Sequence, residues 1–475
     1  MNSTLSEALC TAAKRHGDQI ALCHRDGDVL YSALGGIQPT QKSIELIAGT
    51  QSIEEYRLIW QCLCDGKPFL PLNPKFPPER ISQIQQAIDF ANLPPDLADL
   101  ADLAYLIFTS GTSGEPKGVP IAGQQLSHYS ATLQSILQIN SNDKVLQLGD
   151  LSFDISIMAM LMAWPHGAQL CTLPPEHTLM ATRYAEDLAI TVWLSVPSVV
   201  SLAAKAGLLT PNSLPHIRIA VFGGEALPYE TLRLFSLAAP NARLFNFWGP
   251  TEGTISLSHY EIERALLQTE QAPSGLDIIP LGFAHPGVEL ALWNTELNDF
   301  SDAPGELCAC SAQVTSGYLN RPDLNQTQFF MHRGKRWYHT GDLAKWHDQY
   351  GFCYLGRVDR QIKLKGYRIE LQECETALRR ASGSDQVAVI AHPKSASGAV
   401  EGLVGFLVSS MGSVGSEGML TNKDESNDTA RILEKMKALL PNYMLPDRLI
   451  VLKDLPLSAN GKIDYLALEA YAEMR

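Results

Sequence analysis

Apolar runs of strand length alternate with helical patterns through the middle of the chain. The runs lie in "VLQLGDLSF", "TVWLSVPS", "IRIAVFGGEALP" and "ARLFNFWGPTEG", and helical patterns follow Val200 and Tyr229. A strand, helix, strand order with short connections predicts right-handed parallel units in a layered α/β body. Such bodies bind ligands in the loops at the carboxyl ends of their strands. We therefore expect the polar motifs that follow these strands to meet at one edge of a sheet.

The pattern changes near Ile279. From there to Trp346 the segments are shorter, rich in β-formers and punctuated by glycine and proline, which predicts a small β subdomain. A C-terminal α+β domain is expected from about Arg360, and its first helix, "LQECETALRR", places Glu375 and Arg379 at the spacing of a favourable i,i+4 ion pair. The polar, glycine-rich segment 409–429 is typical of a mobile surface loop.

Composition narrows the function classes. At 475 residues the chain is too long for one ordinary core, because single cores stop growing beyond roughly 250–300 residues. The formal charge of −14 argues against a nucleic-acid surface, which needs a basic face. No apolar run reaches the ~18–20 residues of a membrane span, and Leu5, Ala8, Leu9 and Ala12 recur at helical spacing, as on a buried helix rather than a signal peptide. We expect a cytoplasmic protein that binds neither nucleic acid nor a membrane.

The cysteines and histidines show no metal-binding motif. The nine cysteines include no C-x-x-C pair, which favours reduced thiols and no structural zinc. The C-x-C pairs Cys62/Cys64 and Cys308/Cys310 are each expected to share one face of a strand. The twelve histidines are scattered without an H-E-x-x-H motif, so metal ligation by histidine carries little weight.

One polar loop has the composition of a phosphate site. In "YLIFTSGTSGEPKGV" (105–119), a buried strand is followed by glycines that let backbone amides point inward, by serine and threonine hydroxyls, and by Lys117. The loop is not a Walker A motif, because no G-K-[ST] follows at the required spacing. Taken alone, a polar glycine-rich loop is more often an ordinary flexible hairpin.

Five further motifs follow this loop in a fixed order: "NFWGPTEGT", "GELCACSAQVTSGYLNRPD", "YHTGDLAKW", "GRVDRQIKLKGYRIE" and "LPLSANGKIDYLAL". The series resembles the adenylate-forming enzymes, in particular the amino-acid adenylation domains of nonribosomal peptide synthesis and the D-alanine:D-alanyl carrier protein ligases. The resemblance runs from residue 5 to residue 470. It implies an α/β fold with a large multilayer N-terminal domain of parallel sheets and a small β subdomain (1–358), and a mobile small α+β C-terminal domain (359–475).

The resemblance implies a site for ATP and Mg²⁺. Joining a carboxylate to the α-phosphorus of ATP brings two anions together, so catalysis must consist chiefly of positioning and charge neutralisation. In the family's motifs, Thr251 contacts the α-phosphate and Glu252 helps to hold Mg²⁺, a hard cation suited to carboxylate oxygen. The implied nucleotide-binding residues are Thr109, Ser110, Gly111, Thr112 and Lys117 in the phosphate loop, Asn246, Trp248 and Gly249 near adenine, Asp342 on the ribose, and Arg357 near ribose and phosphate.

The resemblance also implies a catalytic lysine on the C-terminal domain. Lys462, in "NGK", matches the residue between the substrate carboxylate and the α-phosphate, where an ammonium offsets charge as the bond forms. Asp359 matches the family's hinge, so that rotation there would withdraw Lys462 and allow thioester formation. The acceptor thiol is expected from phosphopantetheine on a separate carrier protein, because the string "LGGIQPT" (34–40) lacks the serine of an attachment site.

The implied substrate is a neutral amino acid. Asp154, in "LSFDIS", matches the aspartate that pairs with the substrate α-amino group; the alternative is an aspartate that caps the next helix. The other pocket positions are apolar, glycine or serine, so a charged side chain would be rejected: Ile155, Met158, Leu194, Val221, Gly223, Phe247, Ile255 and Ser256, with Lys462 beside the carboxylate. Phe247 should narrow the pocket and Gly223 should widen it.

Alanine, including D-alanine, fits this pocket best, and proline or a branched aliphatic amino acid stays open. Two other functions also stay open. An acyl-CoA synthetase of the same fold would accumulate a CoA thioester rather than a carrier thioester. A nonenzymatic nucleotide-binding or scaffold protein would show no amino-acid-dependent pyrophosphate exchange.

Overall fold

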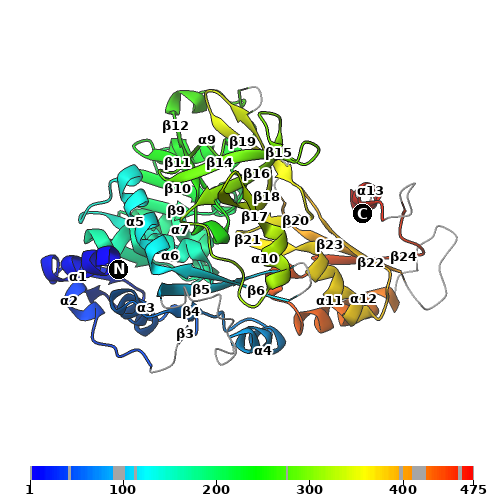
Figure 1. The fold of residues 1–475 in the computed structure, drawn as a ribbon, viewed down its shortest axis with the longest axis horizontal. Coiled ribbons are helices and arrows are strands. Elements are labelled where there is room, and N and C mark those ends of the chain that lie inside the picture. Colours follow the sequence, from blue (N-terminus) through cyan, green and yellow to red (C-terminus); the bar gives the residue numbers. More distant parts are fainter. Residues whose placement is uncertain are drawn as a thin grey trace. The chain divides into compact units, whose positions relative to one another are not determined.

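The computed structural model describes residues 3–40, 44–88, 102–111, 115–273, 276–394, 400–408, 424–457 and 463–473. These fall into two compact units (Figure 1). Unit 1 comprises Met1–Pro74, Asp89–Phe108 and Gly118–Val358, and unit 2 comprises Lys75–Ile88, Thr109–Lys117 and Asp359–Arg475. Unit 2 thus resumes at Asp359 and also takes up two earlier segments of the chain. The assignment of 1–358 and 359–475 as catalytic core and moving domain stays a prediction.

The main sheet of unit 1 has nine strands in the order β13-β12-β11-β10-β9-β7-β8-β1-β2. The run from β11 to β1 is parallel throughout, and both ends of the sheet carry antiparallel pairs. The predicted parallel α/β body is therefore confirmed. The strands are β1 (Ile20–Cys23), β2 (Val29–Leu30), β7 (Lys144–Gln147), β8 (Gln169–Thr172), β9 (Val192–Ser195), β10 (Ile219–Gly223), β11 (Arg243–Trp248), β12 (Ser258–Ile262) and β13 (Phe283–Ala284).

Helices connect the parallel strands, as the sequence pattern predicts. They include α6 (Asp154–Ala163), α7 (Ala181–Asp187), α8 (Pro197–Lys205) and α9 (Tyr229–Ala238), while α5 (Gly123–Leu137) precedes β7. The sheet residues alternate between two apolar clusters: Leu194 and Val221 belong to one, and their neighbours Trp193 and Ala220 to the other. This alternation is the two-fold period of a strand that is buried on both faces.

The N-terminal part of unit 1 holds α1 (Ser3–Arg15), α2 (Tyr31–Leu34) and α3 (Ile53–Asp65). The expectation that Cys62 and Cys64 share a strand is wrong, because both lie in α3. A capping box fixes the start of this helix: the Ser52 side chain accepts from the Glu55 amide, and the Glu55 carboxylate accepts from the Ser52 amide. A four-stranded sheet has the order β3 (Glu45–Ile47), β4 (Phe69–Pro71), β5 (Leu103–Thr109), β6 (Lys117–Ala122).

The predicted β subdomain is a six-stranded sheet in unit 1. Its order is β15-β14-β16-β18-β17, with β19 paired to β18. Cys308 and Cys310 lie two apart in β16, which confirms that this pair shares a strand. The strands are β14 (Val288–Asn294), β15 (Asp299–Phe300), β16 (Gly305–Ser311), β17 (Phe329–His332), β18 (Lys335–His347) and β19 (Gly351–Arg357), with α10 (Pro322–Gln328) before β17.

Unit 2 is built from short sheets and helices. It contains α4 (Pro78–Ala87), the hairpin β20 (Gln361–Leu364) and β21 (Tyr367–Glu370), α11 (Leu371–Ser382), a sheet of β22 (Val387–Ala391), β23 (Leu403–Val408) and β24 (Arg448–Leu452), α12 (Asp424–Lys437) and α13 (Tyr465–Glu473). The expected loop 409–429 is wrong at its end, because α12 begins at Asp424; residues 409–423 lie outside the described part of the chain.

One expected ion pair of unit 2 has a different partner. Glu375 pairs with Arg360 at 2.8 Å and accepts from the Val389 amide at 3.0 Å, whereas Arg379 donates to the Asp385 carbonyl. Tertiary contacts therefore replace the expected Glu375–Arg379 pair. Among the helices whose residues are described, none combines the length and apolar character needed to cross a bilayer.

Candidate active site

The carboxyl ends of β9, β10 and β11 bring together four of the predicted pocket residues. These strands are neighbours in the sheet (Figure 1), and the register places Leu194 beside Val221 and Gly223 beside Phe247. All four are buried or lie in fully buried stretches of these strands, of which only Arg243 at the start of β11 is partly exposed. The parallel order thus collects at one sheet edge residues that are far apart in the sequence.

Gly223 is a glycine because of the neighbouring strand. A Cβ built at this position would lie 2.9 Å from the carbonyl oxygen of Phe247, closer than such atoms approach in proteins. The β11 backbone takes the space that we expect Gly223 to add to the pocket. Gly223 therefore does not compensate for the pocket volume that the Phe247 ring removes.

Asp154 stands at the first residue of α6. The capping position belongs to Phe153, whose side chain makes no capping bond, so Asp154 is not the helix cap that the alternative interpretation requires. Burial raises the pKa of the Tyr105 and Tyr129 phenols, and the nearby charge of Asp154 raises both pKa values further. The charge of Asp154 therefore acts on two buried tyrosines.

One of these tyrosines contacts a predicted pocket residue. The Tyr129 hydroxyl lies 2.7 Å from the Ser256 hydroxyl, which ties α5 to a predicted pocket residue. The Tyr105 hydroxyl is buried and has no hydrogen-bond partner among the described residues. Tyr105 opens the motif "YLIF" and could have been found from it, whereas Tyr129 lies in a helix without any motif signal.

Two histidine rings pack against the Phe247 ring. The centroid of the Phe247 ring lies 5.5 Å from that of His259 and 5.4 Å from that of His285. Burial lowers the pKa of His285 to about 3, so this ring is neutral throughout the working range of pH. Met158 and Ile255, two further predicted pocket residues, are also buried, and Ile155 is partly exposed. Among the predicted pocket residues that the structure describes, Asp154 is thus the only charged one.

The motif after β11 folds back on itself. A Cβ at Gly249 would lie 2.4 Å from the Cα of Ser256, so only glycine permits this close approach. The short helix η5 (Thr251–Gly253) follows, and Thr254 and Ile255 take left-handed backbone angles with φ of 58° and 75°. The turn returns Ser256 to the strand end from which the chain departed.

Glu252 is fully buried at the start of this turn. Its Oε1 atom accepts a hydrogen bond of 2.7 Å from the Tyr318 hydroxyl, and its backbone carbonyl accepts from the Thr315 amide. A positioned carboxylate oxygen is the ligand type that Mg²⁺ prefers. The residue present thus fits the predicted role, and Tyr318, 66 positions away, is a partner that was not predicted from the sequence.

Three predicted nucleotide-binding residues form one hydrogen-bonded cluster. The Trp248 indole Nε1–H donates to Asp342 Oδ2 at 2.8 Å, and Arg357 Nη1 donates to Asp342 Oδ1 at 2.7 Å. Asp342 and Arg357 are register partners in β18 and β19, while Trp248 comes from the end of β11. The two oxygens of Asp342 are thus each held by a different strand. We name Trp248, Asp342 and Arg357 the Asp342 cluster.

Asn246 lies two residues before Trp248 in β11. Its amide Nδ2 donates to the carbonyls of Pro280 at 2.8 Å and Ile279 at 3.3 Å. Because side chains alternate along a strand, Asn246 and Trp248 point to one face and Phe247 to the other. A single strand end therefore carries the predicted adenine contacts on one face and a predicted amino-acid contact on the other.

The phosphate-loop residues belong to unit 2. Ser110 Oγ donates to the Arg368 carbonyl at 2.8 Å, and the buried Lys117 ammonium lies 3.5 Å from Glu370 Oε1. A Cβ at Gly111 would lie 2.0 Å from the Glu115 carbonyl oxygen, so the loop needs glycine there. The hydroxyl of Thr109 is buried without a hydrogen-bond partner among the described residues.

Two predicted residues lie outside the described part of the chain: Thr112 in the phosphate loop and Lys462. Asp359, the predicted hinge, accepts from the Gln361 amide at 3.0 Å, at the start of the β20–β21 hairpin. The roles of all the site residues stay predictions, while the placement of the described ones in unit 1 or unit 2 is given by the structure.

Comparison with known proteins finds one family along most of the chain. The model of the AMP-binding enzyme matches residues 51–319, and that of the AMP-binding enzyme C-terminal domain matches residues 373–462. A D-alanine–D-alanyl carrier protein ligase of Listeria innocua is 31% identical over 446 residues, which cover 85% of this chain and 84% of that protein. The corresponding ligase of Bacillus velezensis is 31% identical over 359 residues, with coverage of 75% and 68%.

Tyrocidine synthase 3 of Brevibacillus parabrevis is 31% identical over 366 residues, which cover 76% of this chain and 5% of that protein. Among solved structures, the Vibrio cholerae adenylation domain AlmE in complex with glycyl-adenosine-5'-phosphate matches with a TM-score of 0.84 at 24% identity. The match covers 100% of this chain and 98% of that chain. It shows that the two proteins share a fold.

Proposed function

Because the chain belongs to the AMP-binding enzyme family and is therefore an AMP-forming ligase, we propose that it activates a small neutral amino acid as aminoacyl-AMP. Pyrophosphate leaves in this step, and the aminoacyl group then passes to the phosphopantetheine thiol of a separate carrier protein. The names of the D-alanyl carrier protein ligases support both the amino-acid substrate and the carrier.

One observation carries the proposal: the end of β11 places predicted residues of both sites next to each other. Trp248 binds Asp342, and Asn246 is on the same face of the strand, whereas Phe247 is on the other face and is the register partner of Gly223. An enzyme that joins a carboxylate to a nucleotide phosphate must hold both reactants within bonding reach. Adjacent positions on one rigid strand meet this requirement better than positions on separate loops.

The residues divide the work of adenylation by charge. Asp154 binds the substrate ammonium, and the Thr251 hydroxyl and Lys117 ammonium bind phosphate oxygens. Lys462 neutralises the developing charge between the carboxylate and the α-phosphate. Glu252 would hold Mg²⁺, which supplies charge neutralisation on the phosphates when it is bound. Asp342 binds the ribose hydroxyls, with its position fixed by Trp248 and Arg357.

The pocket favours a substrate no larger than alanine. Phe247 and its histidine neighbours occupy the side of the pocket at β11, and Gly223 adds no space because its Cβ direction meets the β11 backbone. Alanine or D-alanine therefore fits better than proline or a branched aliphatic amino acid. Neutral walls around Asp154 leave no partner for a charged substrate side chain.

The test is to identify the product thioester by mass spectrometry. The purified chain receives ATP, Mg²⁺ and alanine of either configuration, with equal concentrations of a phosphopantetheinylated carrier protein and CoA. We expect the aminoacyl group on the carrier protein. Accumulation of aminoacyl-CoA instead would show an acyl-CoA synthetase, and absence of both thioesters together with absence of AMP would overturn the proposal.

A further inference from the structure

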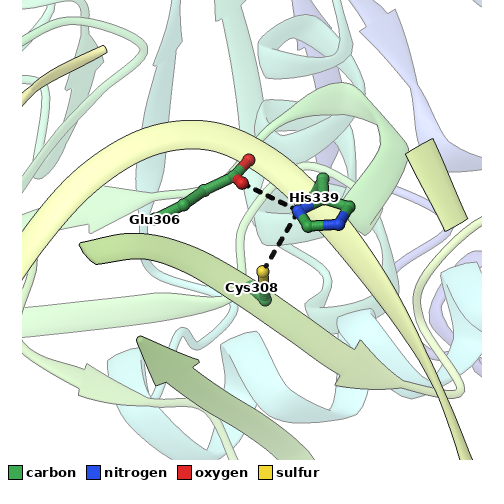
Figure 2. Close-up of side chains that lie close together, drawn as sticks. All are labelled: Glu306, Cys308 and His339. Atoms are coloured by element: carbon green, nitrogen blue, oxygen red, sulfur yellow. Dashed lines mark hydrogen bonds and ion pairs between the residues drawn. The ribbon is translucent and has the colours of Figure 1, made fainter. Parts of the chain in front are cut away.

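A cluster of Glu306, Cys308 and His339 lies in the six-stranded sheet, apart from the residues assigned above (Figure 2). Glu306 and Cys308 are two residues apart in β16, so their side chains project from the same face of the strand. Cys308 is the direct register partner of His339 in β18. Cys308 is fully buried, Glu306 is almost fully buried, and the His339 side chain is 22% exposed. The histidine thus connects a buried thiol and carboxylate with solvent.

The three donor atoms lie close together. His339 Nδ1 lies 2.7 Å from Glu306 Oε2 and 3.5 Å from Cys308 Sγ, and one potential ligand atom from each residue lies within 4.8 Å of the others (Figure 2). In a tetrahedral zinc site the usual bond lengths separate a nitrogen and a sulfur ligand by about 3.5 Å, and a nitrogen and an oxygen ligand by about 3.3 Å. The nitrogen and sulfur therefore already have this spacing. The carboxylate needs to retreat by about half an ångström.

The surroundings hold these side chains in place. Glu306 Oε1 accepts from the Gly341 amide at 2.8 Å, which leaves Oε2 as the oxygen directed at the histidine. The Phe330 ring stacks on His339 with centroids 4.4 Å apart, and the indole of Trp293 stands edge-on to it at 6.1 Å. Such outer contacts orient metal ligands and raise metal affinity.

We propose that Glu306, Cys308 and His339 bind a thiophilic divalent cation of the Zn²⁺ type, with water as the fourth ligand. Coordination takes the Cys308 sulfur as thiolate, so one proton leaves the thiol, and His339 binds through Nδ1 as the neutral tautomer protonated at Nε2. Mg²⁺ prefers oxygen ligands and does not compete for this donor set. The site is therefore distinct from Glu252, which we assign to Mg²⁺.

The proposal is tested by titrating the purified full chain, freed of metal by a chelator that is then removed, with CoCl₂ and with ZnCl₂. Thiolate-to-cobalt absorption reports a sulfur ligand, and calorimetry gives the zinc affinity and stoichiometry. We expect one equivalent of metal and a thiolate-to-cobalt band that ZnCl₂ abolishes. The matched variants Cys310→Ser in the same strand and His332→Gln in the neighbouring strand keep both signals.

Cys308→Ala is expected to lose the cobalt band, and His339→Gln to weaken zinc binding at least tenfold. Glu306→Gln keeps an acceptor for the Gly341 amide and should also bind zinc at least tenfold more weakly, so it tests the ligand role without removing that contact. Circular dichroism and ATP binding show whether each variant is folded. A band that survives in folded Cys308→Ala, or wild-type protein that binds no zinc, would overturn the proposal; neither result depends on amino-acid activation.

Discussion

The Asp342 cluster of unit 1 and the phosphate loop of unit 2 hold their polar groups in different ways. In the Asp342 cluster, partners from β11 and β19 fix both oxygens of a single carboxylate in the β18 strand. In the phosphate loop, Ser110 and Lys117 bind the Arg368 carbonyl and the Glu370 carboxylate, which lie in the β20–β21 hairpin. The Asp342 groups are thus braced by contacts that leave the carboxylate in place. On our proposal, the phosphate-loop groups exchange these partners when they bind phosphate.

This difference predicts opposite effects of removing a partner. Removing a hydrogen bond that holds Asp342 in place should weaken ATP binding. Removing the carboxylate that pairs with Lys117 should strengthen ATP binding. Charged pairs in both regions are buried, so each substitution also has a cost in stability, which has to be measured separately.

The largest effect is expected for Asp342→Ala. It leaves the Arg357 guanidinium without its carboxylate partner in a buried position and removes the acceptor of the Trp248 indole, a loss of about 3–5 kcal/mol for a broken buried pair. We expect the Kd for ATP, measured by calorimetry, to rise at least 100-fold. Asp348→Ala, an exposed position in the same hairpin, should have no effect. Unchanged ATP affinity in folded Asp342→Ala would show that the cluster is structural only.

Asp154→Ala should raise the KM for the amino acid by about 10–100-fold, since a hydrogen bond to a charged group contributes about 1.5–3 kcal/mol. The Kd for ATP should not change. The comparison substrate is the corresponding acid without the amino group, whose poor turnover should be insensitive to the substitution. Asp187→Ala, an exposed aspartate of α7, serves as the matched control. Equal losses with and without the substrate amino group would contradict the pairing.

Trp248→Phe should raise the Kd for ATP by roughly 5–10-fold, because it keeps a ring but loses the hydrogen bond to Asp342, worth about 1–1.5 kcal/mol. Trp248→Tyr should recover part of this affinity if its hydroxyl reaches the same carboxylate. Trp346→Phe, at an indole that is 45% exposed, should bind ATP normally. ATP binding by Trp248→Phe that equals the wild type would mean that Trp248 does not brace Asp342.

The smallest and opposite effect is expected for Glu370→Gln. The substitution removes the charge that faces Lys117 but keeps an acceptor for Gln361, so the apo protein should unfold at a lower temperature. ATP should then bind a few-fold more tightly and raise the unfolding temperature more than in the wild type. Glu434→Gln, exposed in α12, should change neither quantity. Weaker ATP binding by folded Glu370→Gln would remove the contrast between the two regions.

The parallel sheet could be predicted because each buried strand and each following helix has its own periodicity. The motif residues Asn246, Trp248 and Thr251 could be located because they stand close together at the end of β11 and directly after it. By contrast, C-x-C spacing does not distinguish helix from strand, and the capping box of Ser52 and Glu55 places Cys62 in α3. Short motifs therefore locate candidate residues without defining the elements that surround them.

Contacts across long sequence separations account for what could not be predicted. The bond from Trp248 to Asp342 spans 94 positions, and the bond from Tyr318 to Glu252 spans 66. Glu375 has a helical neighbour at the right spacing but pairs with Arg360, because packing brings that guanidinium closer. No local pattern contains these pairings, since they depend on the arrangement of whole strands.

Amino-acid-dependent exchange of pyrophosphate into ATP tests the central claim most directly, when wild type and Lys462→Ala are measured side by side with Lys453→Ala as the control. We predict exchange with alanine or D-alanine by the wild type and by Lys453→Ala, and at least a 100-fold loss in Lys462→Ala with ATP binding preserved. Wild-type protein that shows no exchange with any amino acid, or Lys462→Ala that exchanges at a near-normal rate, would contradict the account.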